Sequence, residues 1–431
     1  MPILRALAFA SFAFVHAAVA AVDPLPFKAD VTVAADGSGD FKTIQAAIES
    51  IPSDNRERRV IFIKDGTYHE KVRIDPRYVT LRGQSRDGTR IEFPQGREEY
   101  SRTTDTLGFA VLNLHGDDCV LENLTVENTH GVIGKHAFAI YGTADRTVIT
   151  DCNVYSQGND TLSLWNGDTG RYYHARLKVR GSVDFICPRG WCYLTDCEIY
   201  EVNPGASAAI WHDGSKNPDQ KFVLRNCRFD GVENWRFARH HADAQFYLLD
   251  CTFSAAMRDL APKRVIYPTN GGAPAEADLK RNKELDAINR WGERCYYFNC
   301  HRTGGDYAWH ADNLASAPGS PSPEQLTAKW TFAGTWDPEN TEGPTIKRIT
   351  WDGGGAKVVF SENVTVKGRP ALVLRGGEAA AYQSGSGSDT LVFAGHLRTK
   401  PEGAKLDLAG GAIVATEAGA ALRTSKTDLP Q

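Results

Sequence analysis

A short strand-like pattern recurs seven times between residues 120 and 302, and it constrains the fold more than any other feature of the chain. Each copy starts with apolar or aromatic residues, usually has Asn or Asp at its fourth place, and has Leu or Cys at its fifth. The segments are VLENLTV (120–126), VITDCNV (148–154), YHARLKV (173–179), YLTDCEI (193–199), VLRNCRF (223–229), YLLDCTF (247–253) and YYFNCHR (296–302). Successive fifth positions are 28, 25, 20, 30, 24 and 49 residues apart, and the last gap spans about two periods. One strand pattern per unit of this length predicts a solenoid.

The segments between the strands decide which solenoid this is. No long amphipathic helix lies between them, which argues against helical solenoids and doubly wound α/β folds. A parallel β-helix accounts for the pattern, because each coil stacks on the last at strand spacing and equivalent positions form interior ladders. Cysteine in such a ladder acts as a small buried hydrophobe, so we favour buried thiols over a disulfide framework. Cys187 and Cys192 lie outside the ladder, and either a local disulfide or two free thiols fits their spacing.

The first folded segment, residues 31–52, predicts a strand, a glycine-containing loop and a helix that caps the solenoid. Asp40 is the expected N-cap of this helix. Its apolar face would be formed by Phe41, Ile44, Ile48 and Ile51. Later in the chain, residues 255–293 interrupt the repeat with a loop and a helical stretch, and residues 324–336 are expected to close the solenoid. Short alternating strands with glycine turns over residues 345–425 predict a small β-sandwich-like accessory module.

The N-terminal residues 1–20 have the features of a secretory signal peptide: Arg5 near the start, an apolar stretch, and the small residues Ala18 and Ala20. The apolar run is shorter than the roughly 20 residues that span a bilayer, so we expect a secreted or periplasmic protein and no membrane partner. The formal net charge is −4 and no basic block is present, which argues against nucleic-acid binding. We also expect a monomer.

Two aspartates carry the predicted chemistry: Asp160 in GNDTL and Asp184 in GSVDFI, 24 residues apart. On a coil of that length they occupy neighbouring coils, about 4.8 Å apart at the same edge of the solenoid. Two carboxylates that close cannot both ionise easily, so one pKa rises and the other falls, which separates an acid from a nucleophile or base. The alternative is that both are turn residues. Asp184, however, lies in an apolar run, where a charge is costly unless it has a role or a partner.

Four segments together resemble the ordered motifs of the pectin methylesterase (pectinesterase) family: VAADGSGDFKTIQAAI, GNDTL, GSVDFI and FARHH. The resemblance covers residues 29–340 and implies an all-β fold, a right-handed single-stranded parallel β-helix, as the catalytic domain. It implies hydrolysis of methyl esters of galacturonate, with pectin or a related polysaccharide as partner. By position, Asp184 matches the nucleophile, Asp160 the general acid/base, and Arg239 the arginine that orients the nucleophile and keeps it ionised by lowering its pKa.

The chain departs from the family pattern at polar positions. The family has Gln where Asn159 and His136 stand, Trp where His241 stands, and a Gly-Asn loop where Pro188 and Arg189 follow Cys187. The glutamines donate hydrogen bonds to the oxyanion of the tetrahedral intermediate, and losing one such donor typically costs about 10²-fold or more in rate. We expect Asn159 and His136 to supply these donors instead.

The expected mechanism is nucleophilic catalysis by Asp184, with Asp160 protonating the departing alkoxide and then deprotonating the attacking water. Candidate sugar platforms, each equally compatible with simple packing, are Phe185, His241, Trp165, Trp191, Trp211 and Trp235. We expect no cofactor and no metal, because adjacent residues such as His240 and His241 point apart on a strand.

Two other functions fit a β-helix with paired carboxylates. A polygalacturonase-like glycosidase also uses two carboxylates, and a pectate lyase uses Ca²⁺, but the sequence lacks a Gly-His-Gly segment and an acidic cluster for Ca²⁺. A non-catalytic carbohydrate-binding protein would explain the altered oxyanion residues. Retention of both aspartates and of Arg239 argues for the enzyme.

Overall fold

The computed structural model describes residues 29–205, 208–269, 271–339, 346–351, 355–373, 379–395, 405–407 and 411–415. The expected signal peptide, residues 1–20, lies outside these ranges. Within them, no helix has the length and apolar character needed to cross a membrane.

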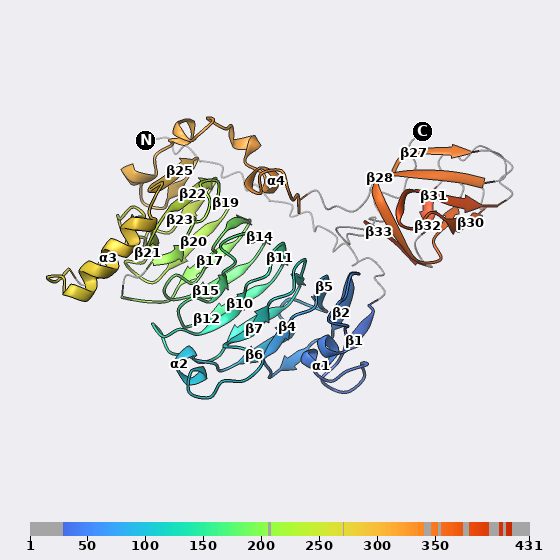
Figure 1. Cartoon of the computed structure of the whole chain (residues 1–431), viewed down its shortest axis with the longest axis horizontal. Coiled ribbons are helices and arrows are strands. Elements are labelled where there is room, and N and C mark those ends of the chain that lie inside the picture. The colour runs from blue at the N-terminus through green and yellow to red at the C-terminus, as the bar shows by residue number, and fades with distance from the viewer. Residues whose placement is uncertain are drawn as a thin grey trace, which may run out of the picture.

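Residues 31–302 wind into a parallel β-helix whose successive coils lie side by side (Figure 1). Its largest face is a ten-stranded sheet of β1 (Val31–Val33), β2 (Arg59–Ile63), β5 (Val79–Gly83), β8 (Val120–Glu122), β11 (Thr147–Thr150), β14 (Arg171–Ala175), β16 (Trp191–Thr195), β19 (Phe222–Arg225), β22 (Ala244–Leu249) and β25 (Glu293–Phe298). A nine-stranded sheet comprises β3 (Gly66–Tyr68), β6 (Thr89–Phe93), β9 (Thr125–Asn128), β12 (Asn153–Ser156), β15 (Lys178–Gly181), β17 (Glu198–Glu201), β20 (Arg228–Gly231), β23 (Thr252–Phe253) and β26 (His301–Arg302).

The third face is divided into two short sheets, and the gap between them becomes the candidate site. One sheet holds β4 (Val72–Ile74), β7 (Ala110–Leu114), β10 (Phe138–Gly142) and β13 (Leu162–Leu164). The other holds β18 (Ala208–Trp211), β21 (Arg236–His240) and β24 (Lys263–Arg264). Single parallel bridges from Leu162 to Ile186 and from Ile186 to Ile210 join the two sheets.

The repeat in the sequence corresponds to a one-residue turn between the ten-stranded and nine-stranded sheets. Every fourth-place residue has a positive φ, between 50° and 57°: Asn123, Asp151, Arg176, Asp196, Asn226, Asp250 and Asn299. Asn and Asp tolerate this left-handed conformation better than most residues, which explains their recurrence. The fifth-place side chains point inward and are at most 4% exposed: Leu124, Cys152, Leu177, Cys197, Cys227, Cys251 and Cys300.

All nine cysteines of the chain are free thiols, and eight of them are buried. Cys187 and Cys192 are both among the buried ones, so the structure has two free thiols at these positions and no local disulfide. Burial raises the pKa of both thiols. The cysteine ladder therefore contributes packing, as the sequence predicts.

The predicted N-terminal helix is present as α1 (Ile44–Glu49), but Asp40 is not its N-cap. Thr43 is the N-cap, and its side chain accepts a hydrogen bond from the Ala46 N–H at 3.4 Å. Asp40 instead accepts from the Thr32 N–H at 2.8 Å and fixes the preceding loop. The carboxylate of Glu70, in the next coil, accepts from the first helical N–H groups and so covers the helix N-terminus.

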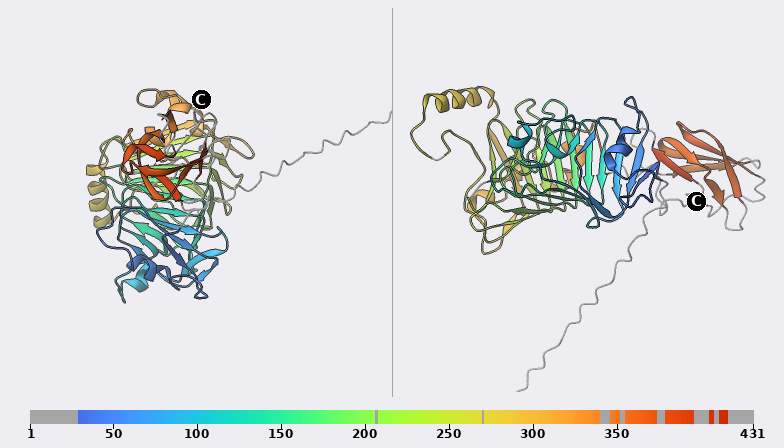
Figure 2. Two further views of the ribbon diagram at one scale, coloured as in Figure 1. Left: turned by 90° about the vertical axis from the view of Figure 1, so that its right-hand side faces the viewer. Right: turned by 90° about the horizontal axis from the view of Figure 1, so that it is seen from below.

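The gap of 49 residues before the last repeat holds one coil, lengthened by the loop and helical stretch that the sequence predicts over residues 255–293. β22 pairs directly with β25, and β23 pairs directly with β26. Between these strands the chain forms β24, which continues the third face, and then α3 (Glu276–Ile288), which lies outside the coil. α3 has no buried residue and projects from the β-helix in the right-hand view of Figure 2.

The segment after the last coil covers the outer face of the ten-stranded sheet, and this differs from the expected cap at the end of the solenoid. It contains η1 (Ala308–His310), η2 (Leu314–Ser316), η3 (Pro323–Gln325) and α4 (Ala328–Thr331). Leu326, Ala328 and Phe332 pack on outward-facing Tyr173, Tyr193 and Tyr247. These outward side chains are aromatic, so the sheet needs an apolar cover on this face.

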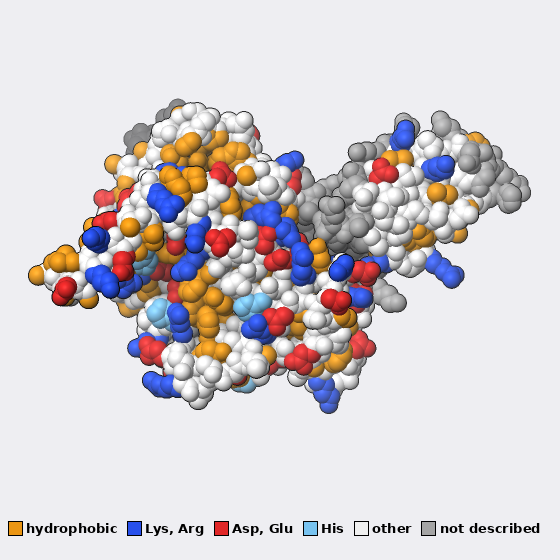
Figure 3. All heavy atoms as spheres, in the orientation of Figure 1, with side chains coloured by type: hydrophobic (Ala, Val, Ile, Leu, Met, Phe, Trp, Pro, Cys, Tyr) orange, Lys and Arg blue, Asp and Glu red, His pale blue; other side chains and the backbone are white. Residues whose placement is uncertain are grey.

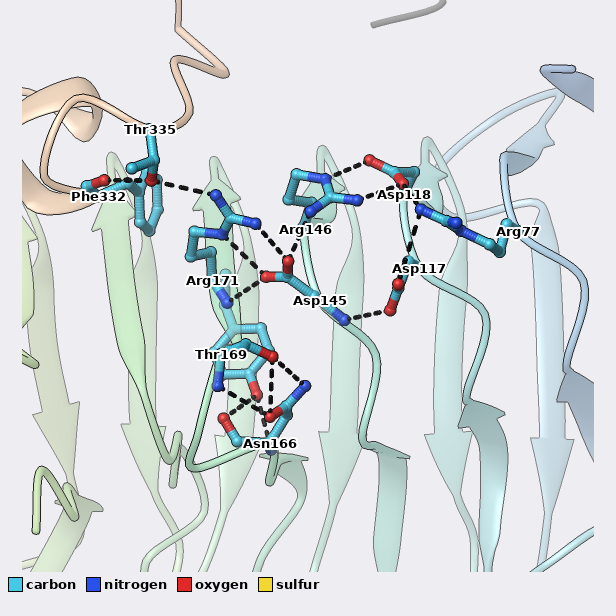
Figure 4. A network of polar contacts seen from close by, with 11 residues as sticks. Arg77, Asp117, Asp118, Asp145, Arg146, Asn166, Thr169, Arg171, Phe332 and Thr335 are labelled. Atoms are coloured by element: carbon cyan, nitrogen blue, oxygen red, sulfur yellow. Dashed lines mark hydrogen bonds and ion pairs between the residues drawn. The ribbon is translucent and has the colours of Figure 1, made fainter. Parts of the chain in front are cut away.

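A network of ion pairs fastens this segment to the coils beneath it (Figure 4). The buried carboxylate of Asp145 contacts the guanidinium groups of both Arg146 and Arg171. Arg146 also binds Asp118 of the preceding coil at 2.6 Å. Arg171 donates to Thr335 of the covering segment at 3.1 Å. Each charged group named here has a partner of opposite charge, which indicates a structural role for the network.

The C-terminal residues form an antiparallel sheet with a separate apolar core. Its strands are β27 (Ile346–Trp351), β28 (Gly355–Gly368), β29 (Ala371–Val373), β30 (Ala379–Ser384), β31 (Ser388–Ala394), β32 (Lys405–Asp407) and β33 (Gly411–Ala415). The module lies beyond the β1 and β2 end of the β-helix (Figure 2). The Lys367 ammonium donates to the backbone oxygen of Arg58 at 3.1 Å and links the two parts.

Candidate active site

Asp160 and Asp184 occupy equivalent positions on neighbouring coils. The bridge between Leu162 and Ile186 fixes this register, since each aspartate lies two residues before its bridge residue. Both aspartates have a positive φ, 60° and 49° respectively, so each sits at a sharp bend of the backbone. Both side chains line one pocket on the third face. The spacing of 24 residues thus brings the two carboxyl groups together as the sequence predicts.

Arg239 holds Asp184 from two coils away. Its guanidinium donates from Nε to Oδ1 at 2.8 Å and from Nη2 to Oδ2 at 2.7 Å, which is a bidentate ion pair. Burial raises the pKa of Asp184, which is 8% exposed, and the ion pair with Arg239 opposes that rise. Arg239 therefore acts in the predicted direction, but burial has the larger effect and the net pKa lies above the ordinary value.

Asp160 has the environment of an acid. Burial, followed by the negative charge of Asp184, raises the pKa of Asp160 to about 7. The Cys187 thiol donates to its Oδ1 at 3.6 Å, and Nε2 of His136 lies 3.4 Å from its Oδ2. Asp160 therefore keeps its proton to a higher pH than an ordinary carboxyl group does. The ionised form of Asp184 is stabilised by its arginine, so the two groups suit different steps of one reaction.

His136 borders the pocket and is neutral. Burial and the nearby charge of Arg97 lower its pKa, and its side chain remains 44% exposed. The helix α2 (Arg97–Tyr100) begins where the Arg97 N–H donates to the backbone oxygen of His136 at 2.9 Å. The Arg97 guanidinium lies over the rings of Phe109 and Phe138 and also lines the pocket. His136 and Arg97 are thus the hydrogen-bond donors beside Asp160.

Asn159 lies next to Asp160 in the chain but faces away from the pocket. Its amide donates to the backbone oxygen of Gly134 at 3.0 Å, and its side-chain oxygen accepts from Ser182 at 2.6 Å. It is not among the residues that line the pocket. The predicted contact of Asn159 with the oxyanion is therefore not present, and Asn159 instead fixes the loop that precedes His136.

The pocket carries more positive than negative side chains. Its cations are Arg97, Arg189, Arg239 and Arg281, and its carboxyl groups are Asp160 and Asp184. The Arg189 guanidinium stacks over the Trp165 ring at 4.4 Å and over the Trp211 ring at 5.4 Å. Figure 3 shows basic and acidic side chains interspersed over α3 and the coils beside it, so the positive excess belongs to the pocket lining. Such a pocket favours an anionic ligand even though the whole chain is slightly acidic.

Comparison with known families places the chain in one of them. Residues 30–248, half of the chain, match the family profile described as Pectinesterase. The chain belongs to the pectinesterase family. A pectinesterase of Petunia integrifolia is 32% identical over 207 residues, which cover 46% of this chain and 53% of that protein. The probable pectinesterase/pectinesterase inhibitor 58 of Arabidopsis thaliana is 33% identical over 211 residues, which cover 47% of this chain and 36% of that protein. The matches therefore span about half, or less, of these relatives.

Solved structures of pectin methylesterases share the fold of this chain. One in complex with a hexasaccharide has a TM-score of 0.55 at 19% identity, and the match covers 72% of this chain and 99% of that one. The enzyme from carrot has a TM-score of 0.54 at 20% identity, covering 71% and 94%. The predicted right-handed parallel β-helix is thereby confirmed.

Three of the aromatic residues predicted to bind sugar line the pocket: Trp165, Trp211 and His241. Phe185 does not, because its side chain points inward and is fully buried in the core beside Gly181. Trp191 does not either, since it lies on the ten-stranded sheet and its indole donates to Asp219 at 3.1 Å. Trp235 is also fully buried. For these three the packing alternative is correct.

Four residues that line the pocket were not predicted from the sequence as ligand contacts: Arg97, Arg189, Tyr267 and Arg281. Arg189 had been noted only as a departure from the loop of the pectinesterase family. Arg97 comes from a short helix, and Tyr267 and Arg281 come from the insertion at residues 255–292, which no repeat position predicts. Among the described residues, no three His, Cys, Asp or Glu side chains form a group that could hold a metal ion.

Proposed function

We propose that this protein hydrolyses methyl esters of galacturonate in pectin, giving pectate and methanol. The observation that carries the proposal is the asymmetric pair of carboxyl groups: Asp184 in a bidentate ion pair with Arg239, and Asp160 with a pKa of about 7 in the same pocket. The pair supplies a nucleophile and an acid at one pH. Membership of the pectinesterase family supports this reaction over glycoside hydrolysis or elimination.

In the first step, the Asp184 carboxylate attacks the ester carbonyl carbon, and the carbonyl oxygen becomes the oxyanion. His136 and Arg97 are the donors that line the pocket on the side of Asp160, and we assign them to the oxyanion. The bond from carbon to the methoxy oxygen then breaks, and Asp160 gives its proton to that oxygen. Methanol leaves, and the galacturonate acyl group remains bound to Asp184 as an anhydride.

In the second step, a water molecule takes the place of methanol. Asp160, now ionised, accepts a proton from this water as its oxygen attacks the acyl carbon. The bond from that carbon to the Asp184 oxygen breaks, which returns Asp184 as a carboxylate held by Arg239. The product carries a free carboxyl group, and Asp160 is again protonated.

The experiment that tests this function compares the products released from pectic substrates. Methyl-esterified homogalacturonan, acetylated pectin and unesterified pectate are each incubated with the full protein. Methanol release from the first, without new reducing ends or unsaturated products, is the expected result. Reducing ends would indicate a glycosidase, unsaturated products a lyase, and binding without any release a non-catalytic protein.

We also propose the division of the chain that the sequence predicts: a signal peptide over residues 1–20, a catalytic domain over 29–340 and an accessory module over 345–425. The separate apolar core of the C-terminal sheet supports the last boundary. Expression in a bacterial host, followed by measurement of the mass of the exported protein, tests whether residues 1–20 are removed. Export without loss of mass would contradict the proposed cleavage.

A further inference from the structure

The insertion at residues 255–292 brings two side chains to the catalytic pocket from outside the repeat. Tyr267 follows β24, which pairs with β21 so that Lys263 lies opposite Arg239. Asn282 of α3 fixes the backbone of Tyr267, accepting from its N–H at 2.9 Å and donating to its carbonyl oxygen at 2.8 Å. Arg281, the preceding residue of α3, lines the pocket together with Tyr267. The insertion begins after residue 248, where the match to the family profile ends.

A chain of hydrogen bonds with a fixed direction reaches Tyr267 from the β-helix. The Trp211 indole N–H donates to Nδ1 of His241 at 2.9 Å, and an indole is a donor only. Burial, with the charges of Arg239 and Arg281, lowers the pKa of His241 to about 4, so the ring is neutral at ordinary pH. Its one proton is therefore on Nε2, which lies 3.0 Å from the Tyr267 hydroxyl oxygen. His241 is the donor in this contact.

The direction of this chain determines what the Tyr267 hydroxyl does. Because its oxygen accepts from His241, its own proton has to be donated elsewhere. Among the described residues the Tyr267 hydroxyl has no hydrogen bond other than the one with His241, and Tyr267 lines the pocket. The hydroxyl is thus a donor that faces the space a ligand would fill, and it selects for an oxygen acceptor.

Arg281 adds a positive charge at the same place. Its guanidinium carbon lies 3.9 Å from the centre of the Tyr267 ring, and no carboxylate partner for it occurs in the described part of the chain. A hydroxyl donor beside a guanidinium group recognises a carboxylate better than a neutral ester, because charge-assisted hydrogen bonds are about twice as strong as neutral ones. The reaction centre itself lies at Asp184, which Arg239 binds and which lines the same pocket as this pair.

We propose that Tyr267 and Arg281 form a subsite for the free carboxylate of a uronic acid unit that neighbours the ester being cleaved. His241 is its positioning residue, since it fixes the direction of the Tyr267 hydroxyl. This inference rests on the proposed esterase function and adds a preference to it: the protein acts best where a neighbouring unit is already de-esterified. The ligand class is an acidic oligosaccharide that combines free and esterified carboxyl groups.

The test is a binding measurement by calorimetry with two trisaccharides of galacturonic acid, one unesterified and one fully methyl-esterified. Tyr267→Phe and Arg281→Gln should each weaken binding of the unesterified ligand about tenfold, the value of one hydrogen bond to a charged group. Binding of the esterified ligand should change less than about twofold. Lys283→Gln is the matched control, because Lys283 is exposed on the same helix, carries the same charge and does not line the pocket.

His241→Phe tests the positioning role, because it removes both hydrogen bonds of the ring. It should weaken binding of the unesterified ligand as much as Tyr267→Phe does, and the double variant should be no weaker than either single variant. Additive losses would overturn the positioning role. Equal binding of both ligands by the wild-type protein, or unchanged binding in Tyr267→Phe and Arg281→Gln, would overturn the subsite.

Methanol release separates this inference from the proposed function. If the wild-type protein releases no methanol but shows the expected binding pattern, the esterase function fails and the subsite stands. If it releases methanol but shows no difference between the two ligands, the subsite fails and the esterase function stands. Thermal melting of each variant verifies that the fold is intact.

Discussion

At the scale of single residues, Arg239 gives two otherwise similar aspartates, Asp160 and Asp184, different acidities. Asp160 and Asp184 have the same position on neighbouring coils and nearly the same exposure, 9% and 8%. Only Asp184 has a bidentate arginine partner. Burial raises the pKa of both groups, but Arg239 opposes the rise for Asp184, whereas the charge of Asp184 adds to it for Asp160. The division into nucleophile and acid follows from this difference.

The pH dependence of the reaction should report Asp160. The first step needs its proton, and the pKa of Asp160 is about 7. We therefore expect kcat/KM for methanol release to fall as pH rises above about 7, by up to tenfold per pH unit. The measurement is a pH profile of the wild-type protein. A profile that stays flat between pH 6 and pH 9 would contradict the role of Asp160 as acid.

The same carboxyl group should affect stability, with a sign that can be derived. Its pKa is about 7 in the folded protein and about 4 in the unfolded chain, so the folded state binds the proton more tightly. Stability is therefore lost as pH rises through this range, and Asp160→Asn avoids the loss. We expect the variant to be more stable than the wild type by up to about 4 kcal/mol at pH 8, but by only about 1.4 kcal/mol at pH 5. Urea unfolding at both pH values measures this, and equal effects at the two pH values would contradict it.

Some residues of the candidate site could be predicted from the sequence, and others could not. Asp160 and Asp184 were predicted as neighbours because a spacing of 24 residues on a solenoid implies contact between coils, whereas Arg239 was placed beside Asp184 by the family resemblance alone. The directions of Asn159 and Phe185 were not, since each lies next to an aspartate with a positive φ, where the alternation of a regular strand is broken. No local pattern in the sequence predicts the positive φ of these two aspartates.

At the scale of elements, the one-residue turn defines the β-helix. The fourth-place residues bend the chain from one sheet to the next, and several of them also bond between coils. Asn226, for example, has a φ of 50° and donates its amide to the Asp196 carboxylate. Both properties favour Asn, so the recurrence of Asn and Asp in the sequence reflects a backbone requirement.

Substitution of Asn226 separates these two contributions. Asn226→Gly loses the side-chain bond but keeps the backbone conformation without strain, whereas Asn226→Ala loses both. We expect Asn226→Ala to be less stable than Asn226→Gly by about 1 kcal/mol, the cost of the left-handed conformation for a residue with a Cβ. Urea unfolding of the two variants measures the difference. An alanine variant as stable as the glycine variant would show that the turn imposes no strain.

The buried cysteines give a second prediction at this scale. Burial raises the pKa of Cys119, outside the ladder, to about 11 and that of Cys152, in the ladder, to about 12, and all nine thiols are free. A thiol reagent should therefore react slowly or not at all with the native protein, because thiolates are scarce and covered. After unfolding without reductant, nine thiols should react. A count of seven would mean that one disulfide exists.

Elements that belong to the repeat were predictable, and elements outside it were not. The seven strand segments, the capping helix and the C-terminal strands follow from local periodicity. The interruption over residues 255–293 was predicted, but its contribution of Tyr267 and Arg281 to the pocket was not, because no repeat position fixes where an insertion lies. The path of α3 and the cover over the ten-stranded sheet depend on contacts between distant segments, such as Tyr247 with Trp330.

At the scale of the whole molecule, a slightly acidic chain presents a basic pocket. The formal net charge is −4, yet four arginines and only two carboxyl groups line the pocket. The long-range field of the protein thus opposes an anionic polysaccharide, and the short-range field of the pocket attracts it. The cations come from the short helix α2, from two coils and from the insertion, so only the folded chain assembles them.

This arrangement predicts how salt acts on the reaction. Added salt screens the pocket charges from the substrate at distances beyond about 10 Å at 0.1 M. We expect KM for partly de-esterified pectin to rise several-fold between about 0.05 M and 0.5 M NaCl, while kcat changes little. Steady-state kinetics of methanol release at several salt concentrations measure this. A KM that falls with added salt would mean that the acidic surface outweighs the pocket.

The most direct test of the proposed mechanism is to measure methanol release by the Asp184→Asn variant. The variant keeps the size of the side chain but removes the attacking oxygen anion, so methanol release should fall by at least about 10³-fold. Asp168→Asn is the matched control, because Asp168 is 79% exposed, lies outside the pocket and should leave the rate unchanged. Loss of activity in Asp184→Asn alone, with melting temperatures like that of the wild type, is the predicted result. An Asp184→Asn protein that keeps more than about a tenth of the wild-type rate would contradict nucleophilic attack by Asp184.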